Sequence, residues 1–280
     1  MTAIERWNTR VSKHHAQSIR AQEEMEAANP STWTKGDFWE KFANNFRGDP
    51  RRADDPVVER IARELTPDST LLDVGGGGGR LALPLALRCK KVTVVEPSQS
   101  MIDVLKESAS EFEIGNVEIV QDTWEEANVE PADFVLCSHV VYGVDDVEPF
   151  LAKLNSHARQ CVYMPTFTAA PITRFGAFWE PVHGEERSNL PGLPELLSVL
   201  WDMDIYPDVE MMDALRMSRG FKSREDALEQ LRLRVYANPG TEKDALLQKA
   251  MDSMLTETDD GLVIESARPA RLGIVNWKPA

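Results

Sequence analysis

The stretch Leu71-Leu72-Asp73-Val74-Gly75-Gly76-Gly77-Gly78-Gly79-Arg80 decides the fold of this chain. An apolar run ends in an acidic residue, and five consecutive glycines separate it from a helix-like segment. Glycine allows backbone conformations that are closed to other residues and lets a ligand approach the main chain. The stretch therefore predicts a tight turn between a strand and a helix. In open α/β sheets such a turn, at the carboxyl end of the first strand, is where a nucleotide-like ligand binds.

Three further apolar runs end in polar or aromatic groups. The run at 92–95 ends at Glu96, and the run at 117–120 ends in Gln121-Asp122-Thr123-Trp124. The run at 132–138 ends in His139-Val140-Val141-Tyr142. Because the carboxyl ends of parallel strands meet at one edge of a sheet, these ends are predicted to border one ligand crevice.

With these motifs the chain resembles the class I S-adenosylmethionine-dependent methyltransferases. Asp73-x-Gly75-x-Gly77-x-Gly79 is similar to their first motif, and Glu96-Pro97-Ser98 followed by Met101 to their second. Asp122-x-Trp124 resembles the adenine-contacting third motif, and Ser138 to Tyr142 resembles the fourth, which borders the acceptor. The resemblance covers residues 37–166 well and the C-terminal strands loosely.

The resemblance implies S-adenosyl-L-methionine as the cofactor. Glu96 is expected to bind both ribose hydroxyls and Asp122 the adenine amino group. The full set of expected cofactor-binding residues is Asp73, Gly75, Gly76, Gly77, Glu96, Pro97, Met101, Asp122, Thr123, Trp124, Ser138 and Trp39. Three structural alternatives stay open: Asp73 can hold the glycine turn, Asp122 can cap a helix, and Trp124 can be a core residue.

The acceptor side is less well defined by the sequence. His139 and Tyr142 are the candidate catalytic residues, because a neutral imidazole can take a proton near neutral pH. The alternative for His139 is a residue that only packs under a loop. The candidate substrate residues are Trp33, Tyr142, Phe167, Trp179 and His183. No grouping of His, Cys and carboxylates has metal-ligand spacing, so no metal is expected.

The predicted fold class is α/β, a doubly wound and mostly parallel seven-stranded sheet with an antiparallel last strand. An N-terminal helical lid and a helical cap in the C-terminal part are expected in addition. The expected organisation is a helical arm or lid at 1–55 and a Rossmann-like cofactor-binding core at 56–166. A cap with one core helix and strand follows at 167–257, and C-terminal strands at 258–280 complete the sheet.

Several local expectations follow from capping residues and breakers. A helix is expected from Arg80 to about Lys90, and a strand at 161–164 is expected to stop at Pro165. Segments 262–264 and 272–277 are expected to form an antiparallel edge pair. Residues 38, 42 and 46 would share one helical face, and His14 and His15 would lie on a solvated face.

Composition limits the partners. The net charge of −15 repels phosphate backbones and anionic membrane surfaces, so nucleic acid and membrane are not expected partners. There is no apolar signal region and no long apolar span, and the three cysteines suit a reducing compartment, so a cytoplasmic protein is expected. A small-molecule acceptor is expected. A carboxylated acceptor is the sharper hypothesis, because six cations crowd one segment: Arg216, Arg219, Lys222, Arg224, Arg232 and Arg234.

Three functions remain in competition at this point. The main one is a methyltransferase acting on a small molecule by in-line displacement. A non-catalytic S-adenosylmethionine-binding sensor or scaffold is the second. An NAD(P)-dependent oxidoreductase is the third, and Asp73, Asp122 and the lack of a Tyr-x-x-x-Lys pair weigh against it.

Overall fold

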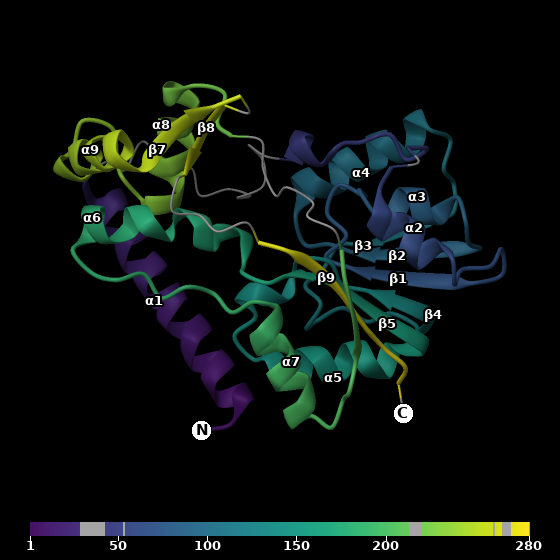
Figure 1. Ribbon diagram of the computed structural model, residues 1–280. Helices are drawn as coiled ribbons and strands as arrows, with labels where there is room; N and C mark the ends of the chain where they lie inside the picture. Colours follow the sequence, from purple (N-terminus) through teal and green to yellow (C-terminus); the bar gives the residue numbers. More distant parts are fainter. Residues whose placement is uncertain (29–42, 53, 213–219, 260, 265–269, 280) are drawn as a thin grey trace. The chain divides into compact units, whose positions relative to one another are not determined.

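A computed structural model describes residues 1–28, 43–52, 54–212, 220–259, 261–264 and 270–279. The chain divides into two compact units (Figure 1). We call Gly36–Thr166, Leu197–Met212 and Gly273–Ala280 the sheet unit. We call Met1–Lys35, Phe167–Leu196 and Asp213–Leu272 the helical unit.

The sheet unit is built on a seven-stranded sheet of order β3-β2-β1-β4-β5-β9-β6. Neighbouring strands from β3 to β5 are parallel, and β9 runs antiparallel to β6. The strands are β1 (Thr70–Val74), β2 (Lys91–Val95), β3 (Val117–Val120), β4 (Ala132–Leu136), β5 (Ala158–Phe167), β6 (Asp208–Met211) and β9 (Leu272–Trp277). The predicted doubly wound α/β fold with a mostly parallel sheet is confirmed.

Helices lie on both faces of this sheet (Figure 1). On one face are α2 (Pro56–Ala62), α3 (Ala82–Ala86) and α4 (Gln99–Glu111), and α5 (Val147–His157) lies on the other. Short 3-10 turns are η1 (Ala43–Phe46) and η2 (Val141–Gly143), and α7 (Leu193–Asp202) precedes β6. Four consecutive residues of β1, from Leu71 to Val74, are buried, as in a central parallel strand covered on both faces.

Helix caps in the sheet unit follow the sequence signals. The Asp55 carboxylate accepts from the amides of Val57 and Val58, and Pro56 occupies the first turn of α2. The Ser98 hydroxyl accepts from the Met101 amide at the start of α4. The glycine turn follows directly after β1, and the capped helix α4 packs near it.

The helical unit has its own apolar core. It comprises α1 (Ala3–Ala28), η3 (Pro171–Phe178), α6 (Trp179–His183), α8 (Arg224–Val235) and α9 (Glu242–Met254), with a hairpin of β7 (Leu255–Thr258) and β8 (Gly261–Ile264). Ser223 and Thr241 cap α8 and α9, as their capping-box patterns predict. Phe178, Leu231, Leu247 and Met251 are fully buried in its core.

Three local predictions were wrong. Segment 262–264 does not pair with 272–277: β8 pairs with the adjacent β7, whereas β9 lies inside the main sheet. Strand β5 continues through Pro165, whose carbonyl accepts from the His139 amide. Helix α3 spans only Ala82–Ala86 and is therefore much shorter than 80–90: after it the Arg88 amide donates to the Leu85 carbonyl at 2.9 Å, in a tight turn that does not continue the α-helix.

The N-terminal segment is an α-helix, and His14 on it is buried rather than solvated. Its Nδ1 lies 2.6 Å from the Ser188 carbonyl oxygen, and Arg187 donates to its Nε2 at 2.8 Å. Burial and the Arg187 charge lower the His14 pKa from 6.5 to about 4. Of the predicted helical face at 38, 42 and 46, only Phe46 lies within the described residues, in η1.

Candidate cofactor and acceptor site

The glycine turn has the backbone that the sequence predicts for a ligand-binding loop. Gly75, Gly77 and Gly79 have φ of +68°, +54° and +81°, a region that L side chains rarely adopt. A Cβ at Gly75 would lie 2.3 Å from Val140 Cγ2, whereas one at Gly77 would meet only Met101 Sδ at 3.8 Å. The chain thus packs tightly behind the turn and leaves room in front of Gly77.

A cavity of about 320 Å³ opens at this turn, at the carboxyl ends of β1, β2 and β4. Of the predicted cofactor residues, it brings together Asp73, Gly75, Gly76, Gly77, Glu96, Pro97, Met101 and Ser138. His139 lines the same cavity, as do residues that were not assigned to the cofactor in advance: Phe46, Gly78, Arg80, Leu81 and Val140. Arg80 closes the glycine stretch, and Phe46 belongs to an aromatic cluster, so both carried a sequence signal.

Glu96 bridges two backbone amides at the cavity wall. Its Oε2 accepts from the Gly77 amide and its Oε1 from the Ser98 amide, each at 2.9 Å. The side chain is buried. Because each carboxylate oxygen can accept a second hydrogen bond, this geometry leaves Glu96 able to bind a pair of hydroxyls while it fixes the turn.

Asp73 is a buried carboxyl at the centre of the cavity. Burial, and after it the negative charge of Glu96, raise its pKa to about 7. Among the described residues, no amide of the glycine turn donates a hydrogen bond to Asp73. The alternative in which Asp73 only holds the turn therefore has no support in these residues. A cation placed beside Asp73 would stabilise its charged form.

Two further groups in the cavity suit a zwitterionic, hydroxyl-bearing cofactor. The Ser138 hydroxyl is buried and has no hydrogen-bond partner within the described part of the chain. Arg80 is the one cationic side chain lining the cavity there, and its Nη1 donates to Asp55 at 2.7 Å. The residues present therefore fit a ligand that carries both charges and several hydrogen-bonding groups.

His139 lines this cavity and lies just after β4. Its φ is +61°, which is unusual for a residue other than glycine and often marks a functional position. Its Nδ1 lies 3.1 Å from the Tyr142 hydroxyl, and the two rings stack. Burial and then the Arg80 charge lower its pKa to about 4, so the imidazole is neutral at neutral pH.

The third motif is placed differently. Asp122 lies two residues beyond β3, next to the end of β2, where its Oδ1 accepts from the Thr123 amide at 2.9 Å. Neither residue lines the cavity. The Trp124 indole packs on α5: its Nε1 donates to the Phe150 carbonyl and the Lys153 ammonium lies 4.6 Å from the ring. The structure thus places Trp124 in the core and not at the cavity.

The remaining candidates lie elsewhere. Trp33 and Trp39 are outside the described residues. Phe167, Trp179 and His183 belong to the helical unit. Trp179 is fully buried beneath the Arg187 guanidinium, and His183 Nε2 lies 2.8 Å from the Val235 carbonyl oxygen. Their assignment to the acceptor stays a prediction.

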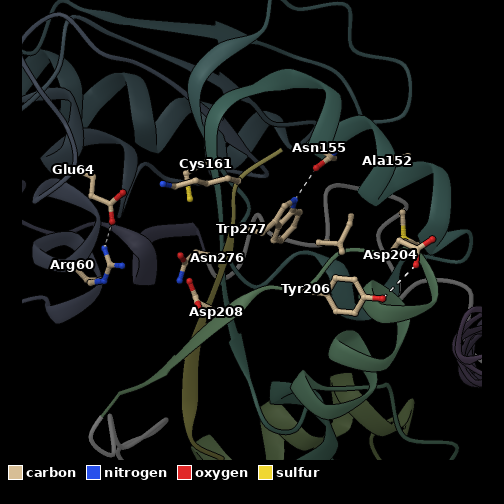
Figure 2. Close-up of a pocket in the computed structure, with 13 residues that line it drawn as sticks. Arg60, Glu64, Ala152, Asn155, Cys161, Asp204, Tyr206, Asp208, Asn276 and Trp277 are labelled. Carbon is tan, nitrogen blue, oxygen red and sulfur yellow. Dashed lines mark hydrogen bonds and ion pairs between the residues drawn. The ribbon is translucent and has the colours of Figure 1, made fainter. Parts of the chain in front are cut away.

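A second cavity, of about 920 Å³, lies toward the β6 edge of the sheet (Figure 2). Its lining includes Tyr206, Trp277, Arg60 and Glu64. Arg60 is neutralised by ion pairs to Glu64 and Glu210, and Trp277 donates to Asn155. It has no glycine turn and none of the predicted site residues, so it does not compete with the smaller cavity as the cofactor site.

Among the described residues there is neither a metal-binding cluster nor a helix that could span a membrane. No group of three or more His, Cys, Asp or Glu residues there could hold a metal ion. No helix among the same residues is both long and apolar enough to cross a bilayer.

Comparison with known proteins identifies the class of the chain. The family described as "Methyltransferase domain" matches residues 72–160, which include the glycine turn, Glu96 and His139. A ubiquinone biosynthesis O-methyltransferase of Rickettsia felis is 31% identical over 196 residues, covering 65% of this chain and 78% of the relative. An uncharacterized protein of Haemophilus influenzae is 27% identical over 201 residues, covering 71% and 72%.

Solved structures share the fold. The [4+2]-cyclase SpnF superposes with a TM-score of 0.53 at 14% identity, covering 83% of this chain and 84% of that one. A putative methyltransferase from Bacillus halodurans gives 0.51 at 13% identity, covering 81% and 99%. Because one fold can serve several chemistries, these likenesses define the architecture and not the reaction.

The chain belongs to the class I S-adenosylmethionine-dependent methyltransferases. It is an enzyme of the transferase class, and its cofactor is S-adenosyl-L-methionine. The oxidoreductase alternative is thereby set aside, and the open questions concern the acceptor and the residues that serve it.

Proposed function

We propose that this methyltransferase methylates a hydroxyl oxygen of a small-molecule acceptor, with His139 as the general base. The observation that carries the proposal is that His139 lines the cavity that also contains the glycine turn, with its Nδ1 3.1 Å from the Tyr142 hydroxyl. The relatives named ubiquinone biosynthesis O-methyltransferase support an oxygen acceptor. The net charge of −15 supports a small molecule over a nucleic acid.

The proposed cofactor contacts follow from the cavity. Glu96 would accept from the two ribose hydroxyls, and Asp73 and Ser138 would bind the amino-acid end. Arg80 would offset the cofactor carboxylate with the donors that its ion pair to Asp55 does not use. Helix α3 has only five residues, so its dipole would add little to this interaction. Asp122 and Thr123 are kept as candidates for the adenine.

The proposed chemistry needs little beyond positioning and one proton transfer. When bound, S-adenosylmethionine supplies a methyl group attached to a positively charged sulfur. That sulfur is the leaving group, and it keeps the electron pair of the broken carbon–sulfur bond. Tyr142 would accept from the Nδ1–H of His139, so that Nε2 carries the lone pair that takes the acceptor proton. The lowered His139 pKa means that the imidazole is unprotonated at neutral pH, and it also makes the imidazole a weaker base than a free histidine. Holding the reactants in line contributes roughly 7–11 kcal/mol to barrier reduction in well-oriented systems.

A methyl-transfer screen tests this proposal. Purified protein would be incubated with methyl-labelled cofactor and pools of phenols, aliphatic hydroxy compounds, amines and thiols, and labelled products would be identified. We expect label only in hydroxyl-bearing pools. His139→Gln should lower kcat by about 10²–10⁴-fold with unchanged affinity for S-adenosylhomocysteine.

The matched control is His157→Gln, which removes an imidazole of α5 in the same unit and should leave kcat unaltered. Label in amines or thiols alone would overturn the oxygen assignment. A protein that binds S-adenosylhomocysteine but labels no pool would favour the binding-only alternative.

A further inference from the structure

The helical unit contains several arginines, and most of them have clear structural partners. Arg232 forms a two-pronged ion pair with Asp244 at 2.8 and 2.7 Å, and Arg224 pairs with Asp252 at 2.6 Å. Two cations of the predicted cluster, Arg216 and Arg219, lie outside the described residues. The charges that the sequence grouped together are thus not equivalent, because Arg224 and Arg232 are already neutralised.

Arg187 shows what a satisfied buried arginine looks like in this unit. Its guanidinium lies 3.8 Å from the centre of the Trp179 ring. It donates to the His14 carbonyl and Nε2 and to the Ser18 hydroxyl. With its donors used by the protein itself, Arg187 has a structural role.

Arg174 and Arg234 form a different arrangement, in which two arginines share one aromatic ring. Both guanidinium carbons lie 4.4 Å from the centre of the same ring, Phe175, so they are no further apart than twice that distance. Both side chains are half-buried, and two like charges repel at this separation. Arg174 comes from η3 and Arg234 from the last turn of α8. The fold therefore gathers two cations around one aromatic ring.

Arg174 has neither a hydrogen bond nor an ion pair within the described part of the chain. Its neighbour Thr173 has a buried hydroxyl that also lacks a partner there. Burial lowers the Arg174 pKa, and burial followed by the Arg174 charge lowers that of Arg234 to about 10. Arg234 donates to the Gln230 carbonyl at 3.5 Å, so the group without an acceptor is Arg174. A guanidinium is costly to desolvate without an acceptor, so a bound anion would stabilise Arg174 in this setting.

We propose that Arg174 and Arg234, held on the Phe175 ring, bind the carboxylate group of a small-molecule anion. The planar guanidinium fork matches the two oxygens of a carboxylate. A singly charged small molecule also suits the acidic protein better than a polyanion. The anion site stands on the geometry of the helical unit alone.

The test measures binding of a simple probe to the full-length protein in the absence of cofactor. Benzoate and its neutral analogue benzamide would each be titrated by calorimetry. We expect benzoate to bind at least tenfold more tightly than benzamide. Arg174→Gln should remove this preference, and Arg174→Lys should retain part of it because the charge remains. Inorganic phosphate as a third probe separates a carboxylate site from a general oxyanion site.

The matched control is Arg224→Gln, which removes one positive charge from the same unit at a position with its own ion pair, and it should keep the benzoate preference. Equal affinities for benzoate and benzamide in the wild type would overturn the site. So would an unchanged preference in Arg174→Gln, or phosphate binding more tightly than benzoate.

A stability measurement separates the anion site from a structural role. Because Arg174 has no protein partner among the described residues, Arg174→Gln without ligand should melt at the wild-type temperature or above it. A clear fall in melting temperature would mean that Arg174 holds the fold, and the proposal would be lost. Titration of S-adenosylhomocysteine into the same variant should match the wild type, so failure of the anion site is distinguishable from failure of the proposed methyl transfer.

Discussion

The sheet unit and the helical unit contain buried charges of opposite sign in unlike settings. In the sheet unit, Asp73 and Glu96 place two carboxyl groups beside a glycine turn. In the helical unit, Arg174 and Arg234 place two guanidinium groups around Phe175. Neither arrangement stabilises the free protein as well as an apolar core would. The difference indicates that one unit is prepared for a ligand with positive groups and the other for an anion.

The largest expected effect is a loss of folding stability when Gly75 is replaced, and its size measures how tightly the glycine turn is packed. Gly75→Ala should destabilise the protein by about 2–4 kcal/mol, because a strained positive φ is combined with a Cβ that overlaps Val140. Gly240 in the helical unit also has positive φ, but a Cβ there would meet nothing within 4 Å. Gly240→Ala should therefore cost only about 1–2 kcal/mol. Urea denaturation measures both, and equal losses would show that close packing at Gly75 is unimportant.

The next effect concerns acid sensitivity of the helical unit. The His14 pKa is about 4 in the folded protein against 6.5 for the free group. The stability that depends on neutral His14 is therefore complete above pH 6.5 and is lost as the pH falls toward 4. We expect about 2 kcal/mol to be lost between pH 6.5 and about pH 5.

His14→Gln should flatten that pH dependence, whereas His15→Gln should keep it. Free energies of unfolding at several pH values provide the comparison. A wild type and a His14→Gln variant with parallel pH profiles would contradict the buried neutral imidazole.

Asp73 should make the affinity for the cofactor depend on pH. Its folded pKa is raised from 3.8 to about 7, so in the free protein stability falls as the pH rises through that window. A cofactor ammonium group prefers the charged carboxylate. Affinity for S-adenosylhomocysteine should therefore rise about tenfold from pH 6 to pH 8.

Asp73→Asn should show no such rise, and Glu118→Gln, a change on exposed β3, should behave as the wild type does. Calorimetric titration across this pH range measures the effect. A flat wild-type profile would place the cofactor's amino group elsewhere.

The sequence predicted the sheet unit well because its signals are local. Short apolar runs, the glycine stretch and the caps Asp55 and Ser98 each specify the element in which they lie. The cavity residues followed from the rule that parallel strand ends meet at one edge. Trp124 was harder to place, because only tertiary packing on α5 distinguishes a core indole from a stacking platform.

The helical unit was less predictable because, as for Trp124, its arrangement depends on contacts between residues far apart in the sequence. The hairpin of β7 and β8 and the placement of β9 depend on which strands meet in space, and the apolar pattern of 262–264 fits either partner. The burial of His14 depends on Arg187 and Ser188, far along the chain. The contrast between Arg232, paired with Asp244, and Arg234, placed on Phe175, cannot be read from their nearly adjacent positions.

The central claim is that the glycine turn and Glu96 form one slot for the adenosyl cofactor. Calorimetric titration of S-adenosylhomocysteine into wild type, Glu96→Ala and Glu118→Ala tests it most directly. We predict at least a tenfold loss of affinity for Glu96→Ala, because two hydroxyls lose a charged acceptor, and wild-type affinity for Glu118→Ala. Wild-type affinity in Glu96→Ala would contradict the account.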